Sequence, residues 1–151
     1  MADKVIIRPA VVTDCPALMG LVQELAVFER EPDAVTVTQQ HFEESGFGNN
    51  PVWWAIVAET EGKVVGFALY YIRYSTWKGQ RMYLEDLVVT EEYRGRGIGK
   101  MLLDELIGIA KQKGFSGMLW QVLDWNEPAI KFYERYKASF DPQWVNVSLD
   151  F

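Results

Sequence analysis

The sequence predicts an α/β (α+β) domain with a mixed central sheet and helices on both faces. Segments rich in β-branched and aromatic residues alternate with segments whose apolar residues recur at helical spacing. The 151 residues are 49% hydrophobic and 14% aromatic, enough to build one core and too rich for a disordered chain. No linker-like stretch, fixed-period repeat or block of like charge interrupts them, so residues 1–151 are predicted to form a single domain.

The first predicted elements are a short strand and a helix. The β-branched residues between Lys4 and Arg8 predict a strand that Pro9 stops. In the helix that follows, Thr13 or Asp14 can act as the cap, and apolar residues recur at helical spacing as far as Phe28.

The middle of the chain is predicted to be mostly strand. After a short helix from Thr38 to Ser45, apolar and β-branched segments run from Val52 to Glu59 and from Val64 to Tyr74. The segment between them, Thr60 to Lys63, is typical of a hairpin turn. A third segment of this kind, Arg81 to Val89, predicts a third consecutive strand.

The last part of the chain alternates helix and strand. Ile98 to Lys113 is predicted to be a helix that ends at Gly114. A strand from Gly117 to Leu123, a helix from Asn126 to Tyr136 and a final strand from Val145 to Phe151 complete the order βααβββαβαβ. This order is the basis for the mixed sheet with helices on both faces.

Charge and composition exclude several functions. The chain has 15 Lys and Arg against 21 Asp and Glu, and its net charge of −6 argues against non-specific nucleic-acid binding. No apolar run approaches the roughly 20 residues of a membrane helix, and the first residues, Met1 to Val5, show no secretory leader. The single cysteine, Cys15, is predicted to be a buried packing residue, and His41 has no metal-ligand partner at suitable spacing. We therefore expect a cytoplasmic protein with no metal, nucleic-acid or membrane partner.

A glycine-rich turn separates the strand at 81–89 from the helix at 98–113. Its residues are Arg94, Gly95, Arg96, Gly97, Ile98, Gly99 and Lys100. Free backbone N–H groups at a helix start, glycines that allow close approach and three cations together predict a phosphate cradle. An ordinary tight turn is the structural alternative.

Two other phosphate-binding motifs do not fit this turn. A P-loop requires glycine where Arg94 stands and a hydroxyl residue where Met101 stands. The dinucleotide fingerprint, counted from Gly95, requires glycine where Lys100 stands. A nicotinamide cofactor is therefore not expected.

The pattern Arg94-x-x-Gly97-x-Gly99 after a strand resembles the acetyl-CoA-binding signature of the GNAT (Gcn5-related) N-acetyltransferases. Further matching segments are Gly46-Phe47-Gly48, Tyr74-Ser75-Thr76-Trp77-Lys78-Gly79, Tyr83-Leu84-Glu85-Asp86, Tyr93-Arg94-Gly95 and Leu123-Asp124-Trp125-Asn126. Together they resemble the diamine acetyltransferase family, especially its thialysine Nε-acetyltransferase branch. The resemblance implies a GNAT fold with a mostly antiparallel sheet, acetyl-CoA as co-substrate, a small-molecule amine as acceptor and a homodimer.

Acetyl transfer to an amine needs a route for the amine's proton, a donor to the carbonyl oxygen and an acid for the leaving thiolate. Glu85 is the candidate for holding the cationic amine and taking its proton, and Asp86 is the second candidate. An ion pair with Arg73 or Arg81 is the structural alternative. Regular alternation places Tyr83, Glu85, Leu87 and Val89 on one face of the strand, and Met82, Leu84, Asp86 and Val88 on the other.

The resemblance assigns the remaining site residues. It implies cofactor contacts from the glycine-rich turn and from Leu87, Val88, Val89, Asn126, Glu127, Pro128 and Ala129. It places Tyr133 at the general acid, whereas spacing alone favours a buried core tyrosine. It lines the amine site with Phe28, Glu29, Ser75, Trp77, Glu85, Asp86, Leu119, Trp120 and Gln121.

Ser75 bears on the choice of substrate. Polyamine-preferring relatives place an Asp here by resemblance, and a hydroxyl supplies no charge for a multiply cationic polyamine. We therefore predict thialysine or another lysine-like amino acid, with a polyamine such as spermidine as the alternative. Two further interpretations stay open: Trp77 packs on the substrate or on its own loop, and Lys78 pairs with a substrate carboxylate or faces solvent. Outside enzymes, the alternative is a CoA-binding sensor, against which Glu85 and Tyr133 argue.

Overall fold

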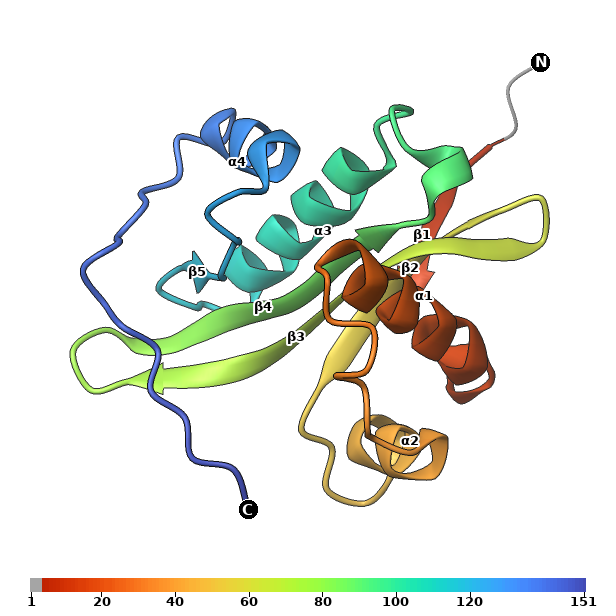
Figure 1. The fold of residues 1–151 in the computed structure, drawn as a ribbon, viewed down its shortest axis with the longest axis horizontal. Helices are drawn as coiled ribbons and strands as arrows, with labels where there is room; N and C mark the ends of the chain where they lie inside the picture. The colour runs from red at the N-terminus through yellow and green to blue at the C-terminus, as the bar shows by residue number, and fades with distance from the viewer. Residues whose placement is uncertain (1–3) are drawn as a thin grey trace. The chain divides into compact units, whose positions relative to one another are not determined.

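The computed structural model describes residues 4–151 (Figure 1). The prediction that the chain shows no secretory leader concerns its first residues. Of these, Met1, Ala2 and Asp3 lie outside the described residues. Contacts divide the chain into two compact units, one ending at Gln121 and one from Val122 to Phe151. That residues 1–151 form a single domain stays a prediction. None of the helices in residues 4–151 is long and apolar enough to cross a membrane.

The first unit is a sheet with helices on both faces. Its strands are β1 (Ile6–Pro9), β2 (Trp54–Thr60), β3 (Lys63–Ser75), β4 (Gly79–Val89) and β5 (Met118–Leu119). Its α-helices are α1 (Cys15–Phe28), α2 (Gln39–Phe47) and α3 (Ile98–Gln112). The strands lie in the order β1-β2-β3-β4-β5, the first four antiparallel to their neighbours and β5 parallel to β4. The predicted mixed, mostly antiparallel sheet is confirmed.

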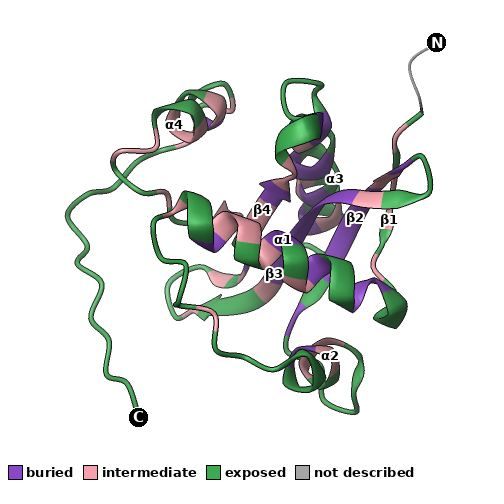
Figure 2. Cartoon of the chain, turned by 45° about the vertical axis from the view of Figure 1, so that its right-hand side comes forward, coloured by how far each residue is buried: buried purple, intermediate pink, exposed green. Residues whose placement is uncertain are grey.

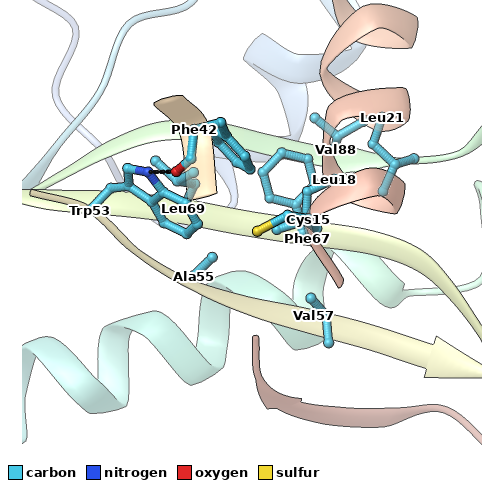
Figure 3. Packing of buried hydrophobic residues seen from close by; sticks show 10 residues of the cluster. All are labelled: Cys15, Leu18, Leu21, Phe42, Trp53, Ala55, Val57, Phe67, Leu69 and Val88. Carbon is cyan, nitrogen blue, oxygen red and sulfur yellow. Dashed lines mark hydrogen bonds between the residues drawn. The ribbon is translucent and has the colours of Figure 1, made fainter. Parts of the chain in front are cut away.

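Two layers of buried side chains hold the helices on this sheet. Under α1 and α2, Leu18 and Phe42 pack on Phe67 of β3 in the cluster drawn in Figure 3. Trp53 closes this cluster: its indole Nε1 donates to the Phe42 carbonyl at 3.1 Å and its ring stacks on the Phe42 ring. Cys15 is fully buried in the same layer, as predicted. Burial raises the pKa of its thiol to about 11, so it is an inert packing residue.

The opposite face of the sheet is covered by α3. Leu102, Leu103 and Leu106 are fully buried there, and Leu102 reaches to within 3.4 Å of the position a Cβ would take on Gly66 of β3. Figure 2 shows buried residues along β2 and the first half of β3, whereas the half of β3 that leads to the turn with β4 is mostly exposed. Because each large apolar side chain buried contributes about 1.5–3 kcal/mol, these two layers fix the sheet that carries the site.

Local signals in the sequence form as predicted. Thr38 caps α2, since its Oγ1 accepts a hydrogen bond from the His41 N–H at 3.1 Å. Glu61 and Gly62 take the left-handed conformation, with φ of 53° and 72°, that a two-residue hairpin turn requires. Gly114, with φ of 75°, follows the end of α3.

A β-bulge interrupts the β3–β4 ladder at Glu85. Asp86 pairs with Leu69 and Leu84 pairs with Tyr70, which leaves Glu85 as an extra residue. The register then places Tyr83, Asp86 and Val88 on the α1 face, and Met82, Leu84, Leu87 and Val89 on the α3 face. Regular alternation therefore predicts the faces wrongly, because one inserted residue reverses every side chain beyond it.

Two predicted strands differ in the first unit. Pro9 belongs to β1 rather than stopping it, because β1 lies at the edge of the sheet, where a missing N–H is tolerated. The strand predicted over Gly117 to Leu123 forms only at Met118–Leu119, which pair with Met82 and Tyr83. The pairing stops just before the bulge, where an unpaired residue disrupts the ladder.

The second unit contains α4 (Glu127–Glu134). Asn126 caps it as predicted, with its Oδ1 accepting a hydrogen bond from the Ala129 N–H at 3.4 Å. The final strand predicted over Val145 to Phe151 is wrong, because no described strand pairs with this segment. Its apolar side chains are exposed, as Val147 at 91% illustrates.

Candidate active site

The bulge on β4 presents two adjacent carboxylates on the side of the sheet that carries α1. Glu85 is exposed and Asp86 is half-buried. The predicted structural alternative, an ion pair with Arg73 or Arg81, is not found: within residues 4–151 neither carboxylate pairs with a cation. An anionic pair without a protein partner is a suitable place for a cationic ligand.

Burial and neighbouring charge raise the pKa of Asp86. Burial raises the pKa of Asp86 to about 7, and the negative charges of Glu85 and Glu29 act on it in the same direction. Burial also raises the pKa of Glu29 above its ordinary value. The structure thus brings Glu29, Glu85 and Asp86 into one electrostatic group, and Asp86 titrates close to neutral pH.

The C-terminal end of α1 delivers Glu29 to this group. Glu29 is the C-cap of the helix, and its N–H donates to the Leu25 carbonyl at 2.8 Å. The Arg94 guanidinium lies over the ring of the neighbouring Phe28, 5.6 Å from the centroid of that ring. Phe28 therefore lies against the glycine-rich turn, while the charge of Glu29 acts on Asp86 of β4.

The β3–β4 ribbon continues the α1 face away from the bulge. Tyr71 and Tyr83 pair across the two strands and their rings stack, with centroids 5.0 Å apart. Ser75 lies further along the same face of β3. Its Oγ accepts hydrogen bonds from the Trp77 and Lys78 N–H groups at 3.2 and 3.0 Å, so it holds the turn. Trp77 is 86% exposed, which removes loop packing as its explanation.

The glycine-rich turn has the geometry of an anion cradle. Gly95 and Gly97 take left-handed conformations, with φ of 77° and 81°, that other residues rarely adopt. No side chain caps Gly97, the N-cap of α3, so the first N–H groups of this helix are left for a ligand. A Cβ built on either glycine meets nothing within 4 Å, so the space above the turn is open. These features fit a diphosphate.

The three cations of the turn are already oriented by the protein. Arg94 donates from Nε to the Val89 carbonyl at 2.9 Å and lies 3.6 Å from the Glu24 carboxylate. Arg96 lies over the Tyr93 ring, 4.8 Å from its centroid. Lys100 pairs with Asp104 one helical turn ahead. The positive charge predicted at this turn is present, and internal contacts fix where it points.

Glu24 supports the glycine-rich turn, and the sequence does not single it out. From α1, its carboxylate accepts hydrogen bonds from the Thr90 hydroxyl and the Glu91 N–H, both at 3.0 Å, and it pairs with Arg94. These partners lie more than 60 residues away along the chain, so no local motif could have identified it. Glu24 ties the segment before the glycine-rich turn to α1, the helix whose C-cap is Glu29.

The backbone of β4 beyond the bulge lacks a strand on its β5 side. Since β5 pairs only with Met82 and Tyr83, Leu87 to Val89 have no partner strand on that edge in the described residues. Leu119 lies beside Tyr83 in this short parallel pairing, and Trp120 and Gln121 follow it outside any strand. The predicted cofactor-contacting backbone is thus at an open edge of the sheet.

The residues predicted on the second unit form a local arrangement of their own. Tyr133 is buried on α4 and its ring packs edge-on against Phe132, with centroids 5.5 Å apart. Asn126, Glu127, Pro128 and Ala129 form the capped first turn of the same helix.

Comparison with known proteins supports the resemblance seen in the sequence. Residues 18–137 match the acetyltransferase (GNAT) family. The thialysine N-epsilon-acetyltransferase of Bos taurus is 41% identical over 142 residues, which cover 89% of this chain and 84% of that protein. Spermidine/spermine N(1)-acetyltransferase-like protein 1 of Homo sapiens is 40% identical over 84% of this chain, but the match covers 19% of that protein.

A similar fold is found among solved structures. An integron cassette protein from the mobile metagenome of V. cholerae superimposes with a TM-score of 0.79 at 28% identity. The alignment covers 97% of this chain and 93% of that protein. The sheet order and the helix positions are therefore those of a known architecture.

Proposed function

The chain belongs to the acetyltransferase (GNAT) family, and on that premise we propose that it transfers an acetyl group from acetyl-CoA to an amine of thialysine or another lysine-like amino acid. The observation that carries this proposal is the carboxylate pair at the β4 bulge. Glu85 and Asp86 share the α1 side of the sheet with Glu29, and within the described chain neither meets a cation. An ammonium substrate supplies the missing charge.

Glu85 and Asp86 divide the work on the amine in this proposal. Glu85, exposed at the bulge, holds the ammonium, and the proton leaves to the carboxylate pair, directly or through water. Asp86 suits this step because its pKa of about 7 lies close to the operating pH of a general base.

The glycine-rich turn and the open edge of β4 hold the donor in this proposal. The N–H groups at the start of α3, with Arg94, Arg96 and Lys100, bind the diphosphate of CoA. Backbone groups of Leu87, Val88 and Val89 bind the pantetheine arm, and an N–H there steadies the carbonyl oxygen. The first turn of α4, from Asn126 to Ala129, completes the CoA contacts.

Acetyl-CoA supplies the thioester that the free amine attacks. A carbon–nitrogen bond forms and the carbon–sulfur bond breaks. The ammonium loses one proton to the carboxylate pair before the attack, and the nitrogen loses a second proton to solvent as the amide forms. The thiolate gains one proton, which we assign to the phenol of Tyr133. Glu85, Asp86 and Tyr133 are thus the groups through which protons move.

Substrate choice follows from the turn between β3 and β4. Ser75 supplies a hydroxyl already used to hold the Trp77 and Lys78 N–H groups, and it brings no negative charge for a second ammonium. One of the two relatives is named for thialysine and the other for spermidine and spermine. A polyamine is therefore the second candidate substrate. The absence of a carboxylate at Ser75 favours the amino acid.

Steady-state thiol release from acetyl-CoA with thialysine, lysine, spermidine and putrescine tests this function. We expect thialysine or lysine to give the highest kcat/KM, and spermidine as the best substrate would overturn the choice.

Tyr133→Phe should lower kcat more than it raises KM; unchanged turnover would remove Tyr133 from the acid's role. CoA binding by calorimetry without turnover of any amine would instead indicate a sensor.

Two properties of the whole protein complete the proposal. We propose a homodimer, supported by the exposed alternating apolar side chains of Val145, Val147, Leu149 and Phe151. Light scattering at micromolar concentration should give the mass of two chains, and the mass of one chain would contradict the homodimer.

We also propose a cytoplasmic location, which the lone buried Cys15 supports. Fluorescent tagging in the source cell would reveal any other compartment.

A further inference from the structure

A strip of paired side chains runs along the α1 face of the β3–β4 ribbon, between Ser75 and the bulge. Its first rung is Arg73 opposite Arg81, and its second is Tyr71 opposite Tyr83. The carboxylates Glu85 and Asp86 follow on β4. Charge therefore changes along the strip from positive, through an aromatic rung, to negative.

The arginine rung is unfavourable by itself. Like charges directly opposite each other on two strands repel, and no carboxylate of residues 4–151 pairs with either arginine. Arg81 is turned to Ser116, donating to its Oγ at 3.4 Å, and packs over Gly117. Arg73 is exposed and its contact within the described chain is with the Tyr83 ring, 5.8 Å from the centroid. Its guanidinium is available to an anion.

The tyrosine rung lies within reach of both charges. Burial raises the pKa of Tyr71, Glu85 raises it further, and Arg73 lowers it. The pKa of Tyr83 is raised by burial, Tyr71 and Glu85, and lowered by Arg73. The stacked rings thus separate a free cation at one end from a free carboxylate pair at the other, and they offer an apolar surface between them.

The spacing of the rungs suits a short zwitterion. Residues on one face of a strand repeat at about 6.7 Å, and the Arg73 guanidinium reaches back toward the tyrosine rung. The carboxylates lie about one further step beyond the tyrosine rung. The span from the guanidinium to the carboxylates therefore suits an extended lysine-like chain with an ion pair at each end.

We propose that Arg73 is a specificity-determining residue that binds the carboxylate of an amino-acid substrate whose distal ammonium lies at Glu85 and Asp86. The aliphatic or thioether chain of the substrate lies across Tyr71 and Tyr83. This inference rests on the proposed function and extends it, because it explains why an amino acid is chosen over a diamine. A second ammonium in place of the carboxylate would meet the positive charge of Arg73 and Arg81.

The test compares each amino acid with its decarboxylated counterpart, which differs only in the group that Arg73 would bind. Thialysine is paired with bis(2-aminoethyl) sulfide, and lysine with cadaverine. Arg73→Gln should lower kcat/KM for the amino acids by about 10- to 100-fold, mostly through KM, because a charge-assisted pair is lost. The diamines should be unaffected or improved. Arg73→Lys should recover part of the loss, since it keeps the charge without the planar fork.

Lys111→Gln, an exposed position on α3, is the matched surface control and should change nothing. Equal loss of kcat/KM for amino acids and diamines in Arg73→Gln would show a structural role and overturn the inference. The inference is also overturned if Lys78→Gln, and not Arg73→Gln, removes the preference. In both cases wild-type activity on the amino acids would leave the proposed function intact. A wild-type protein that acetylates none of the four compounds would overturn the function itself.

Discussion

At the residue scale, the geometry of the carboxylate pair depends on one inserted residue. Glu85 and Asp86 are adjacent in sequence, and regular alternation would send them to opposite faces of β4. The bulge makes Glu85 the unpaired extra residue and places Asp86 on the α1 face, where the charge of Glu29 acts on it. Sequence could identify the residue types but not this geometry, because a bulge is set by pairing with Leu69 and Tyr70 of a different strand.

Asp86→Asn should stabilise the protein in a pH-dependent way. Between the ordinary Asp pKa of about 3.9 and its folded value of about 7, the folded chain keeps a proton that the unfolded chain releases. The free energy of unfolding of the wild type therefore falls as pH rises through this window, whereas that of Asp86→Asn does not. The gain from Asp86→Asn should reach roughly 2–4 kcal/mol above pH 7 and shrink towards about pH 4.

Urea unfolding across this pH range measures the effect, with Asp33→Asn as the exposed control. A difference between Asp86→Asn and the wild type that stays constant from acid to neutral pH would contradict the folded-state pKa of Asp86.

At the element scale, short local signals were predictable and long-range pairings were not. Three local signals each lie within a short stretch of sequence, and all three form in the structure. They are the cap at Thr38, the hairpin turn at Glu61 and Gly62, and the apolar stripe of α3. The segment from Val145 to Phe151 has the alternation of a strand, yet within the described chain it has no partner strand to accept its backbone hydrogen bonds. Alternation of apolar residues therefore gives a strand only where another strand is available to pair with it.

Glu24→Gln tests the link between α1 and the glycine-rich turn. Without the charge, the hydrogen bonds from Thr90 and Glu91 weaken and Arg94 loses its partner. We expect KM for acetyl-CoA to rise about 5- to 10-fold and stability to fall by about 1–2 kcal/mol. Steady-state kinetics at saturating amine measures the first effect, and urea unfolding measures the second.

Glu105→Gln, exposed on α3, is the matched control for Glu24→Gln and should leave both quantities unchanged. If Glu24→Gln leaves KM for acetyl-CoA at the wild-type value, the turn holds its geometry without α1.

At the scale of the whole molecule, the net charge of −6 conceals two opposite local fields. The start of α3 gathers Arg94, Arg96 and Lys100, whereas Glu29, Glu85 and Asp86 gather on the α1 face of β4. An acidic average is therefore compatible with a diphosphate site, because binding depends on the local field. Composition could exclude a broad basic surface, but only the fold shows where each charge lies.

A structure of the protein with CoA and thialysine bound tests the central claim most directly. We expect the diphosphate on the N–H groups at the start of α3 and an ammonium of thialysine against Glu85 and Asp86. A thialysine molecule whose ammonium groups both lie away from these carboxylates, with CoA in place, would contradict it.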